Sequence, residues 1–221
     1  MAVSILQTKV ARGVSGDQTP TLAQALTGGS TVVVVLVVQS SSGFLFDGVT
    51  DANNTYTPRI QQQGGTSTNY DLHIYDKLNI VGGATSLTLD VAASFAGAYD
   101  YAIFELAGVD NGGTIATGFK DAVSNTSHEF FTTGLSGTGI IIGGGEYGDA
   151  ITATITGWTV HDPVTPPNGV YVISRINTFS GEVIAHTISP ASNASCVGAF
   201  YPEAAAAGGS LVFPRWGSVR R

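Results

Sequence analysis

Two aspartates and an asparagine come nearest to a chemical site in this chain. Asp47, Asp51 and Asn53 lie within one short polar stretch. Ca²⁺ prefers several oxygen ligands from a single loop, so these three are candidate ligands. Their spacing completes no calcium loop, and Asp and Asn also accept hydrogen bonds from the backbone of their own turns. We therefore favour a structural Asx-turn and predict no bound metal.

A lone glutamate is the second candidate. Glu105 lies in the otherwise apolar stretch Tyr99–Leu106. A glycosidase acid would need a second carboxylate at a defined separation, and Asp90 and Asp100 are candidates by proximity in sequence only. A single carboxylate in a strand is usually solvated or hydrogen-bonded. We predict a structural role for Glu105 and no catalytic residue.

The remaining reactive residue types are scattered. A zinc site needs about four converging ligands, whereas the histidines show no paired spacing; they are His73, His128, His161 and His186. The single Cys196 lies in an apolar stretch and is predicted to be a buried small hydrophobe. Gly143–Gly145 precedes no helical pattern, so we expect a bend or bulge there and not a phosphate-binding loop. The sequence therefore predicts a protein that is not an enzyme and needs no cofactor.

Aromatic residues offer a sugar-binding platform as an alternative use. The tyrosines in or beside predicted strands are Tyr70, Tyr75, Tyr99, Tyr101 and Tyr147. The loop Gln61–Gln63 and Asn69 would supply amides. Tyrosines are also common in β-sandwiches, where the ring is buried and the hydroxyl reaches a polar partner. We favour packing for these rings.

The composition limits the partners. Of 221 residues, 43% are apolar but only 11% are charged, against the usual quarter. The net charge of −7 argues against nucleic acid as a partner, because phosphate contacts need clustered Lys and Arg. We expect no secretory leader in the first residues, and Val32–Val38 is too short to cross a bilayer, so no membrane partner is predicted. A polar, weakly charged surface suits packing against neighbours in a shell or fibre.

The pattern of elements predicts an all-β protein. Thr31–Gln39 is a continuous β-branched run, which predicts a central strand covered on both faces. Tyr70–Leu78 alternates and predicts a half-exposed strand. Short strands with Gly-rich turns follow to residue 201, which favours a single antiparallel β-sandwich domain with a jelly-roll or Ig-like topology.

The chain changes character after Pro202. We place the sandwich domain at residues 1–202 and a C-terminal arm at residues 203–221. The arm carries Leu211, Phe213, Trp216 and Arg220, and exposed aromatic residues in a terminal segment are costly unless they are buried. The arm either folds back on its own domain or docks on a neighbouring subunit. These four residues are our candidate partner-binding residues.

Several segments together resemble a known family. They are Thr31–Gln39, the turn VTDANNTYT at Val49–Thr57, the stretch HIYDKLNIVGGATSLTLDV, and YAIFELAGVD. In this order they resemble β-sandwich modules found in bacterial surface proteins and phage virion proteins, over about residues 20–202. The chain departs from the pattern at Asn53–Asn54, where the family tends to have Gly-Asn. The resemblance implies a display or adhesion role and brings no catalytic residues.

Two functions follow as expectations. The first is a structural protein of a virus or phage particle, such as a capsid decoration, cement or fibre component. It would be located in the virion and contact copies of itself and a capsid or tail protein. The alternative is a carbohydrate-binding or adhesin module at a cell or virion surface, with glycans as partners.

Overall fold

The protein is built from strands joined by turns and loops. The computed structural model describes residues 2–14, 16–39, 46–63, 70–92, 97–131, 135–147, 157–161, 170–181 and 184–205. Its strands are β1 (Ser4–Gly13), β2 (Thr31–Gln39), β3 (Phe46–Asp51), β4 (Thr57–Gln63), β5 (Tyr70–Lys77), β6 (Leu87–Val91), β7 (Tyr99–Ala107), β8 (Ala116–Phe131), β9 (Ser136–Tyr147), β10 (Thr159–Val160), β11 (Val170–Ser180) and β12 (Ile184–Pro202). None of the described residues is helical, so the predicted all-β class is confirmed.

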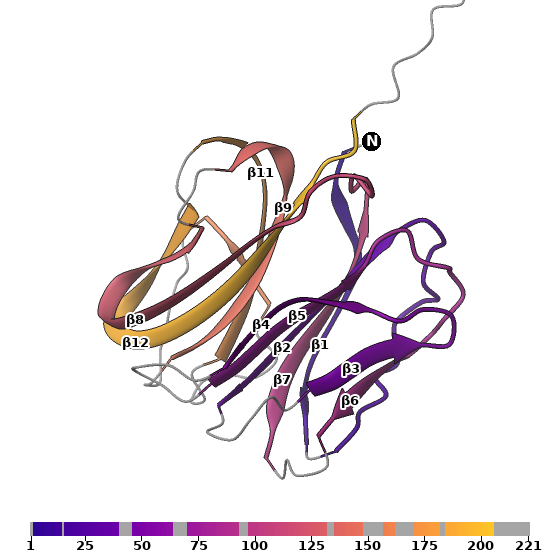
Figure 1. The fold of residues 1–221 in the computed structure, drawn as a ribbon, viewed down its shortest axis with the longest axis horizontal. Coiled ribbons are helices and arrows are strands. Elements are labelled where there is room, and N and C mark those ends of the chain that lie inside the picture. The colour runs from indigo at the N-terminus through magenta and orange to yellow at the C-terminus, as the bar shows by residue number, and fades with distance from the viewer. Residues whose placement is uncertain are drawn as a thin grey trace, which may run out of the picture.

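The strands form three layers (Figure 1). The central five-stranded sheet has the order β1-β7-β2-β5-β4, and the second has the order β10-β11-β9-β12-β8. The short β3–β6 pair covers the other face of the central sheet. The strand pairs within all three sheets are antiparallel, which confirms the predicted sandwich; the third layer was not predicted. The choice between a jelly-roll and an Ig-like topology stays a prediction.

Strand β2 explains why the valine run is unbroken. It lies in the middle of the central sheet, between β7 and β5. Val34 and Leu36 face the β3–β6 layer, whereas Val35 and Val37 face the second sheet. Both faces of the strand are buried, so each position needs an apolar side chain, as the sequence predicted.

Strand β5 corrects one expectation. We predicted a half-exposed strand, but every residue from Tyr70 to Asp76 is buried. Leu72 and Ile74 pack against the second sheet, while Tyr75 packs in the core beneath β3 and β6. The polar residues of this strand are therefore internal, and each needs a hydrogen-bonding partner.

The second sheet curves at one end. We predicted short strands in this half of the chain, but β8 and β12 are long and continuous. Their pairing shifts register between Thr187 and Ser192 and again before Ala194. Such bulges bend a ribbon, and Figure 1 shows β8 and β12 curving together. The curve brings Phe131 into a third apolar cluster with Ile141 on the outer face of the sheet.

Close contact between the two large sheets depends on glycine. We predicted a bend or bulge at Gly143–Gly145, but β9 pairs there with β11 and β12 without a register shift, so that prediction is wrong. A Cβ on Gly144 would lie 2.8 Å from Cγ1 of Val35, across the sheet interface. A Cβ on Gly145 would lie 2.5 Å from the hydroxyl of Tyr171. These glycines leave room for neighbouring side chains.

The described chain ends beside the β7–β8 connection. Beyond β12, the Glu203 amide donates to Thr138 O at 2.8 Å, and the Ala204 amide donates to Gly108 O at 2.8 Å. The predicted partner-binding residues lie outside the described residues; they are Leu211, Phe213, Trp216 and Arg220. The part of the chain that the structure describes contains no helix with the length and apolar character needed to cross a bilayer.

Candidate functional site

The first candidate site is a turn held by one carboxylate. Oδ1 of Asp51 accepts from the backbone amides of Asn53 at 2.7 Å and Asn54 at 2.8 Å. Its Oδ2 accepts from the hydroxyl of Tyr56 at 2.8 Å. Burial and this bond raise the pKa of Tyr56 above its ordinary value. This is the Asx-turn that the sequence favoured.

The same turn ties two loops together. Nδ2 of Asn54 donates to the carbonyl of Val81, and the Val81 amide donates back to Oδ1 of Asn54, both at 2.9 Å. Nδ2 of Asn53 donates to the carbonyl of Gly82 at 3.0 Å. Through these hydrogen bonds, the VTDANNTYT motif holds the turn before β6 in place. Its Asn and Asp side chains serve the fold.

The proposed calcium ligands do not converge. Asp47 and Asp51 are four residues apart on β3, which separates their Cα atoms by roughly 13 Å. Asp47 is exposed and lies instead near Asp17 and Asp90. Partial burial, and then the neighbouring Asp17 and Asp47, raise the pKa of Asp90. Within the described ranges, no group of three or more His, Cys, Asp or Glu residues could hold a metal ion.

Glu105 anchors a long loop. Its Oε1 accepts from the Thr27 amide at 2.6 Å and from the Ser30 hydroxyl at 2.9 Å, while Oε2 accepts from Nε2 of Gln7 at 2.6 Å. Asp100, its proposed partner, lies five residues away on the same strand, roughly 17 Å along β7. That separation exceeds the range for paired glycosidase carboxylates. Glu105 holds the loop before β2 against β7.

A histidine and an aspartate form a fully buried pair on β5. Nε2 of His73 lies 2.5 Å from Oδ1 of Asp71, and Nδ1 lies 3.2 Å from Nε2 of Gln61. An amide nitrogen donates, so Nδ1 accepts and Nε2 carries the proton shared with Asp71. Gln61 also donates to the Tyr75 hydroxyl at 3.1 Å, and that hydroxyl donates to Phe46 O. Asp71, His73 and Tyr75 are buried, whereas the Gln61 side chain that bonds to them lies on the exposed edge strand β4.

The second described histidine is half-buried. His161 follows β10, and its Nε2 lies 2.8 Å from the hydroxyl of Ser174. Its ring meets Phe104 edge to face at 4.9 Å between centroids. Burial lowers the pKa of His161, which favours the neutral ring. The side chains of His128 and His186 lie outside the described part of the structure.

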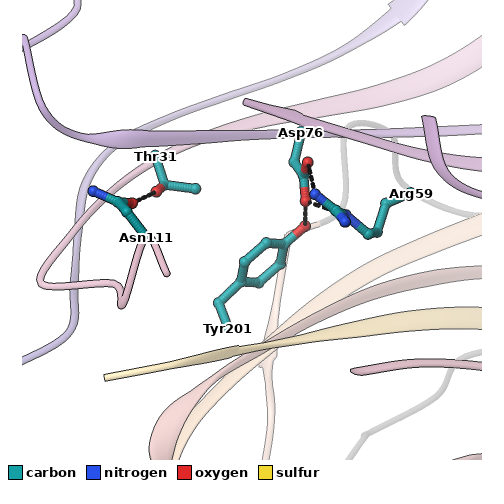
Figure 2. Close-up of polar contacts among 5 residues, drawn as sticks. All are labelled: Thr31, Arg59, Asp76, Asn111 and Tyr201. Carbon is teal, nitrogen blue, oxygen red and sulfur yellow. Dashed lines mark hydrogen bonds and ion pairs between the residues drawn. The ribbon is translucent and has the colours of Figure 1, made fainter. Parts of the chain in front are cut away.

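One polar cluster links the two large sheets (Figure 2). Asp76 on β5 receives two bonds from Arg59 on β4, from Nε at 2.8 Å and from Nη2 at 2.6 Å. The Tyr201 hydroxyl on β12 donates to Oδ2 of Asp76 at 3.1 Å. Burial raises the pKa of Tyr201 well above its ordinary value, and the bond to Asp76 raises the pKa of Arg59. Figure 2 also shows the Thr31 hydroxyl bonded to Oδ1 of Asn111 at 3.1 Å.

The proposed tyrosine platform is internal. Four of its rings are at most 5% exposed, and they are Tyr70, Tyr75, Tyr99 and Tyr101. Gln61 is engaged with His73 and Tyr75, as described above. Asn69 and the side chain of Tyr147 lie outside what the structure describes. Packing, which the sequence favoured for these rings, is confirmed for those four.

An open groove lies at one edge of the sandwich. It has a volume of about 370 Å³ and is lined by Ile5 of β1, by Gly157, Trp158 and Thr159, and by Ser174, Arg175 and Ile176 of β11. The Arg175 guanidinium carbon lies 6.0 Å from the Trp158 ring centre and 5.8 Å from that of Phe179. Ile176 is 49% exposed although it is large and apolar. Unlike the buried networks, this feature is accessible to another molecule.

Sequence reasoning missed this groove and the Asp76 cluster. Neither Arg59 nor Arg175 was singled out in the sequence. The available signal was Trp158, one of only two tryptophans in the chain, directly after Gly157. Comparison of the chain with protein-family models, with curated proteins and with solved structures finds no match in any of the three.

Proposed function

We propose that this chain is a non-catalytic structural module of a virus or phage particle. It acts by packing against copies of itself and against a capsid or tail protein, as a decoration, cement or fibre component. It is located in the virion and needs no cofactor. The resemblance of the VTDANNTYT turn and neighbouring strands to virion and surface modules supports this proposal.

One observation supports the proposal that this protein acts by packing against other subunits. Candidate chemical groups in the described core are engaged in holding the fold, as Glu105 and Asp76 illustrate. An accessible feature of the described structure is a groove of mixed polar and apolar lining between the edges of two sheets, with Ile176 on its wall. Large exposed apolar residues on a weakly charged protein are stabilised by a partner surface. A groove of this kind fits a contact surface better than a reaction centre.

Self-association tests the proposal directly. We expect the molar mass in sedimentation velocity to exceed that of one chain, and to rise with concentration toward a defined oligomer. Antibodies against the chain should detect it in purified virus particles from the source. A chain that remains monomeric at all concentrations and is absent from such particles contradicts the proposal.

A second function has one specific observation in its favour. Trp158 and Arg175 border a groove large enough for one sugar ring, which keeps a carbohydrate-binding or adhesin module as the alternative. This alternative places the protein outside cells or on their surface. Glycan binding by a monomer, lost in Trp158→Ala and retained in Tyr101→Phe, would favour it over particle assembly.

A further inference from the structure

Two adjacent residues in the β7–β8 connection form a chemically reactive pair. Asn111 is exposed and is followed by Gly112, whose backbone nitrogen has no side chain beside it to hinder an attack. In an Asn-Gly pair, this nitrogen can attack the side-chain amide carbon of the asparagine and expel ammonia. The rate of that reaction depends on the groups that contact the two reacting atoms.

A hydroxyl group contacts the oxygen of the Asn111 side-chain amide. The Thr31 side chain donates to Oδ1 of Asn111 at 3.1 Å, and Figure 2 shows the two side chains pointing toward each other. Thr31 begins β2 and is 1% exposed, so this donor is held in place by the fold. Negative charge develops on Oδ1 when a nucleophile adds to the amide carbon, and a donor placed there stabilises that charge. Thr31 therefore makes this amide easier to attack.

A carboxylate contacts the attacking nitrogen. Oδ1 of Asp110 accepts from the Gly112 amide at 3.0 Å. A carboxylate within hydrogen-bonding distance of a proton can accept that proton as a general base. The backbone of Asp110 is also held, because its amide donates to Pro202 O at 2.8 Å and its carbonyl accepts from the Gly113 amide at 3.2 Å. The loop thus places an acceptor at the nucleophile and Thr31 places a donor at the carbonyl that it attacks.

We propose that Asn111 and Gly112 form a self-modification site, at which Asn111 converts to aspartate and isoaspartate without an enzyme. The Gly112 nitrogen forms a bond to Cγ of Asn111, and its proton passes through the Asp110 carboxylate to the departing Nδ2. The Cγ–Nδ2 bond breaks, ammonia leaves, and a cyclic imide remains. Water then opens the ring at either carbonyl, which gives aspartate or isoaspartate. This inference is independent of the proposed packing function.

The site lies where the described chain ends. Val109 forms an isolated β-bridge with Glu203, and the Ala204 amide donates to Gly108 O at 2.8 Å. Isoaspartate adds a methylene group to the backbone of this loop, and both products add a negative charge next to Asp110. We expect the longer backbone to weaken the contacts with residues 203 and 204. Faster hydrogen exchange at the Ala204 amide of the converted protein measures this effect, and unchanged exchange contradicts it.

Timed peptide mapping of the full chain tests the proposal. The folded protein is incubated at neutral pH and digested, and mass spectrometry measures the converted fraction at Asn111. Thr31→Val removes the hydroxyl, whereas Asp110→Asn keeps an acceptor for the Gly112 amide but removes the base. We expect each variant to slow conversion at least about tenfold, as loss of an oxyanion donor or a general base does. Thr31→Ser retains the hydroxyl and should convert at close to the wild-type rate.

Two controls separate this assistance from a general change in the protein. Thr178→Val removes a hydroxyl that bonds to Thr138, and it should leave the rate at Asn111 unchanged. The sequence contains a second Asn-Gly pair, Asn168–Gly169, which lies outside the described residues. Its conversion, measured in the same digests, should be equal in the wild type and in the variants.

The opposite result is equally clear. Conversion at Asn111 that is as fast or faster in Thr31→Val or in Asp110→Asn overturns the inference, because the two hydrogen bonds would then hold the pair in an unreactive arrangement. A wild-type Asn111 that stays unmodified after Asn168 has fully converted also overturns it. None of these measurements depends on self-association, so the packing function stands or fails separately.

Discussion

The hydroxyl of Tyr201 on the last strand donates to Oδ2 of Asp76 on β5, at 3.1 Å and across the interface of the two large sheets. Arg59 holds the same carboxylate from its own sheet with two bonds. A buried carboxylate needs such compensation, because an ion without partners is costly inside a protein. Tyr201 is the member of the cluster that joins the sheets.

Removing this hydroxyl should measurably destabilise the protein. We expect Tyr201→Phe to lower the free energy of unfolding by about 1.5–3 kcal/mol, the usual range for a hydrogen bond to a charged group. Urea denaturation at pH 7 measures it. Tyr101→Phe is the control, since the Tyr101 hydroxyl makes no hydrogen bond to a described residue. Equal losses in both variants would show that the bond to Asp76 contributes nothing specific.

The loop before β2 should depend on the charge of Glu105. In Glu105→Gln one carboxylate oxygen becomes an NH₂ group and the other loses its charge. The Thr27 amide and the Ser30 hydroxyl, which share Oε1 in the wild type, then face either a weaker, uncharged acceptor or an NH₂ group. We expect a loss of about 1–3 kcal/mol of unfolding free energy, as for unsatisfied buried groups. We also expect faster hydrogen exchange at the Thr27 amide. Glu203→Gln, whose side chain makes no hydrogen bond to a described residue, should change neither. Unaltered exchange at Thr27 in Glu105→Gln would refute the anchoring role.

Stability should fall steeply in alkali. Burial raises the pKa of Tyr75 to about 12, against about 10 in an unfolded chain. The folded state therefore retains this proton where the unfolded state loses it. The stabilisation is complete below pH 10 and is lost as the pH rises to about 12, by about 1.4 kcal/mol per pH unit for each such tyrosine.

Tyr75→Phe isolates this contribution. The variant should be less stable at pH 8, because it loses the bond to Phe46 O, but its unfolding free energy should decline less steeply with pH. The slope between pH 10 and 12 should be smaller than that of wild type by about 1.4 kcal/mol per unit. Denaturation curves at several pH values measure both slopes. Parallel curves for the two proteins would mean that Tyr75 ionises normally in the folded state.

Local features could be predicted from the sequence more reliably than contacts between residues far apart in the chain. The valine run of β2 and the Asx-turn at Asp51 follow from the chemistry of a few adjacent residues, and both are present in the structure. The burial of both faces of β5 depends on β3 and β6, a third layer that no local pattern specifies. The partners Asp76 and Tyr201 are far apart in the chain, and their residue types alone do not reveal that they pair.

The pairing of β10 with β11 has the same explanation. β10 begins at Thr159, shortly after Gly157 with its positive φ, and strand pairing across loops cannot be predicted from composition. The arm was expected either to fold back on its own domain or to dock on a neighbouring subunit, but the sequence identified no receiving surface for it.

The spacing between the two large sheets should depend on Gly144 in β9. A Cβ at position 144 would lie 2.8 Å from Cγ1 of Val35 and 3.1 Å from Cγ2 of Val37, so Gly144→Ala forces the sheets or these side chains apart. We expect a loss of about 1–3 kcal/mol in urea denaturation, as for other overpacked cores. Gly48→Ala is the control, because a Cβ there meets no atom within 4 Å. Val35→Ala removes the clashing methyl, so the double variant should be more stable than the sum of the single losses predicts. Strictly additive losses would show that the Gly144–Val35 contact does not set the sheet spacing.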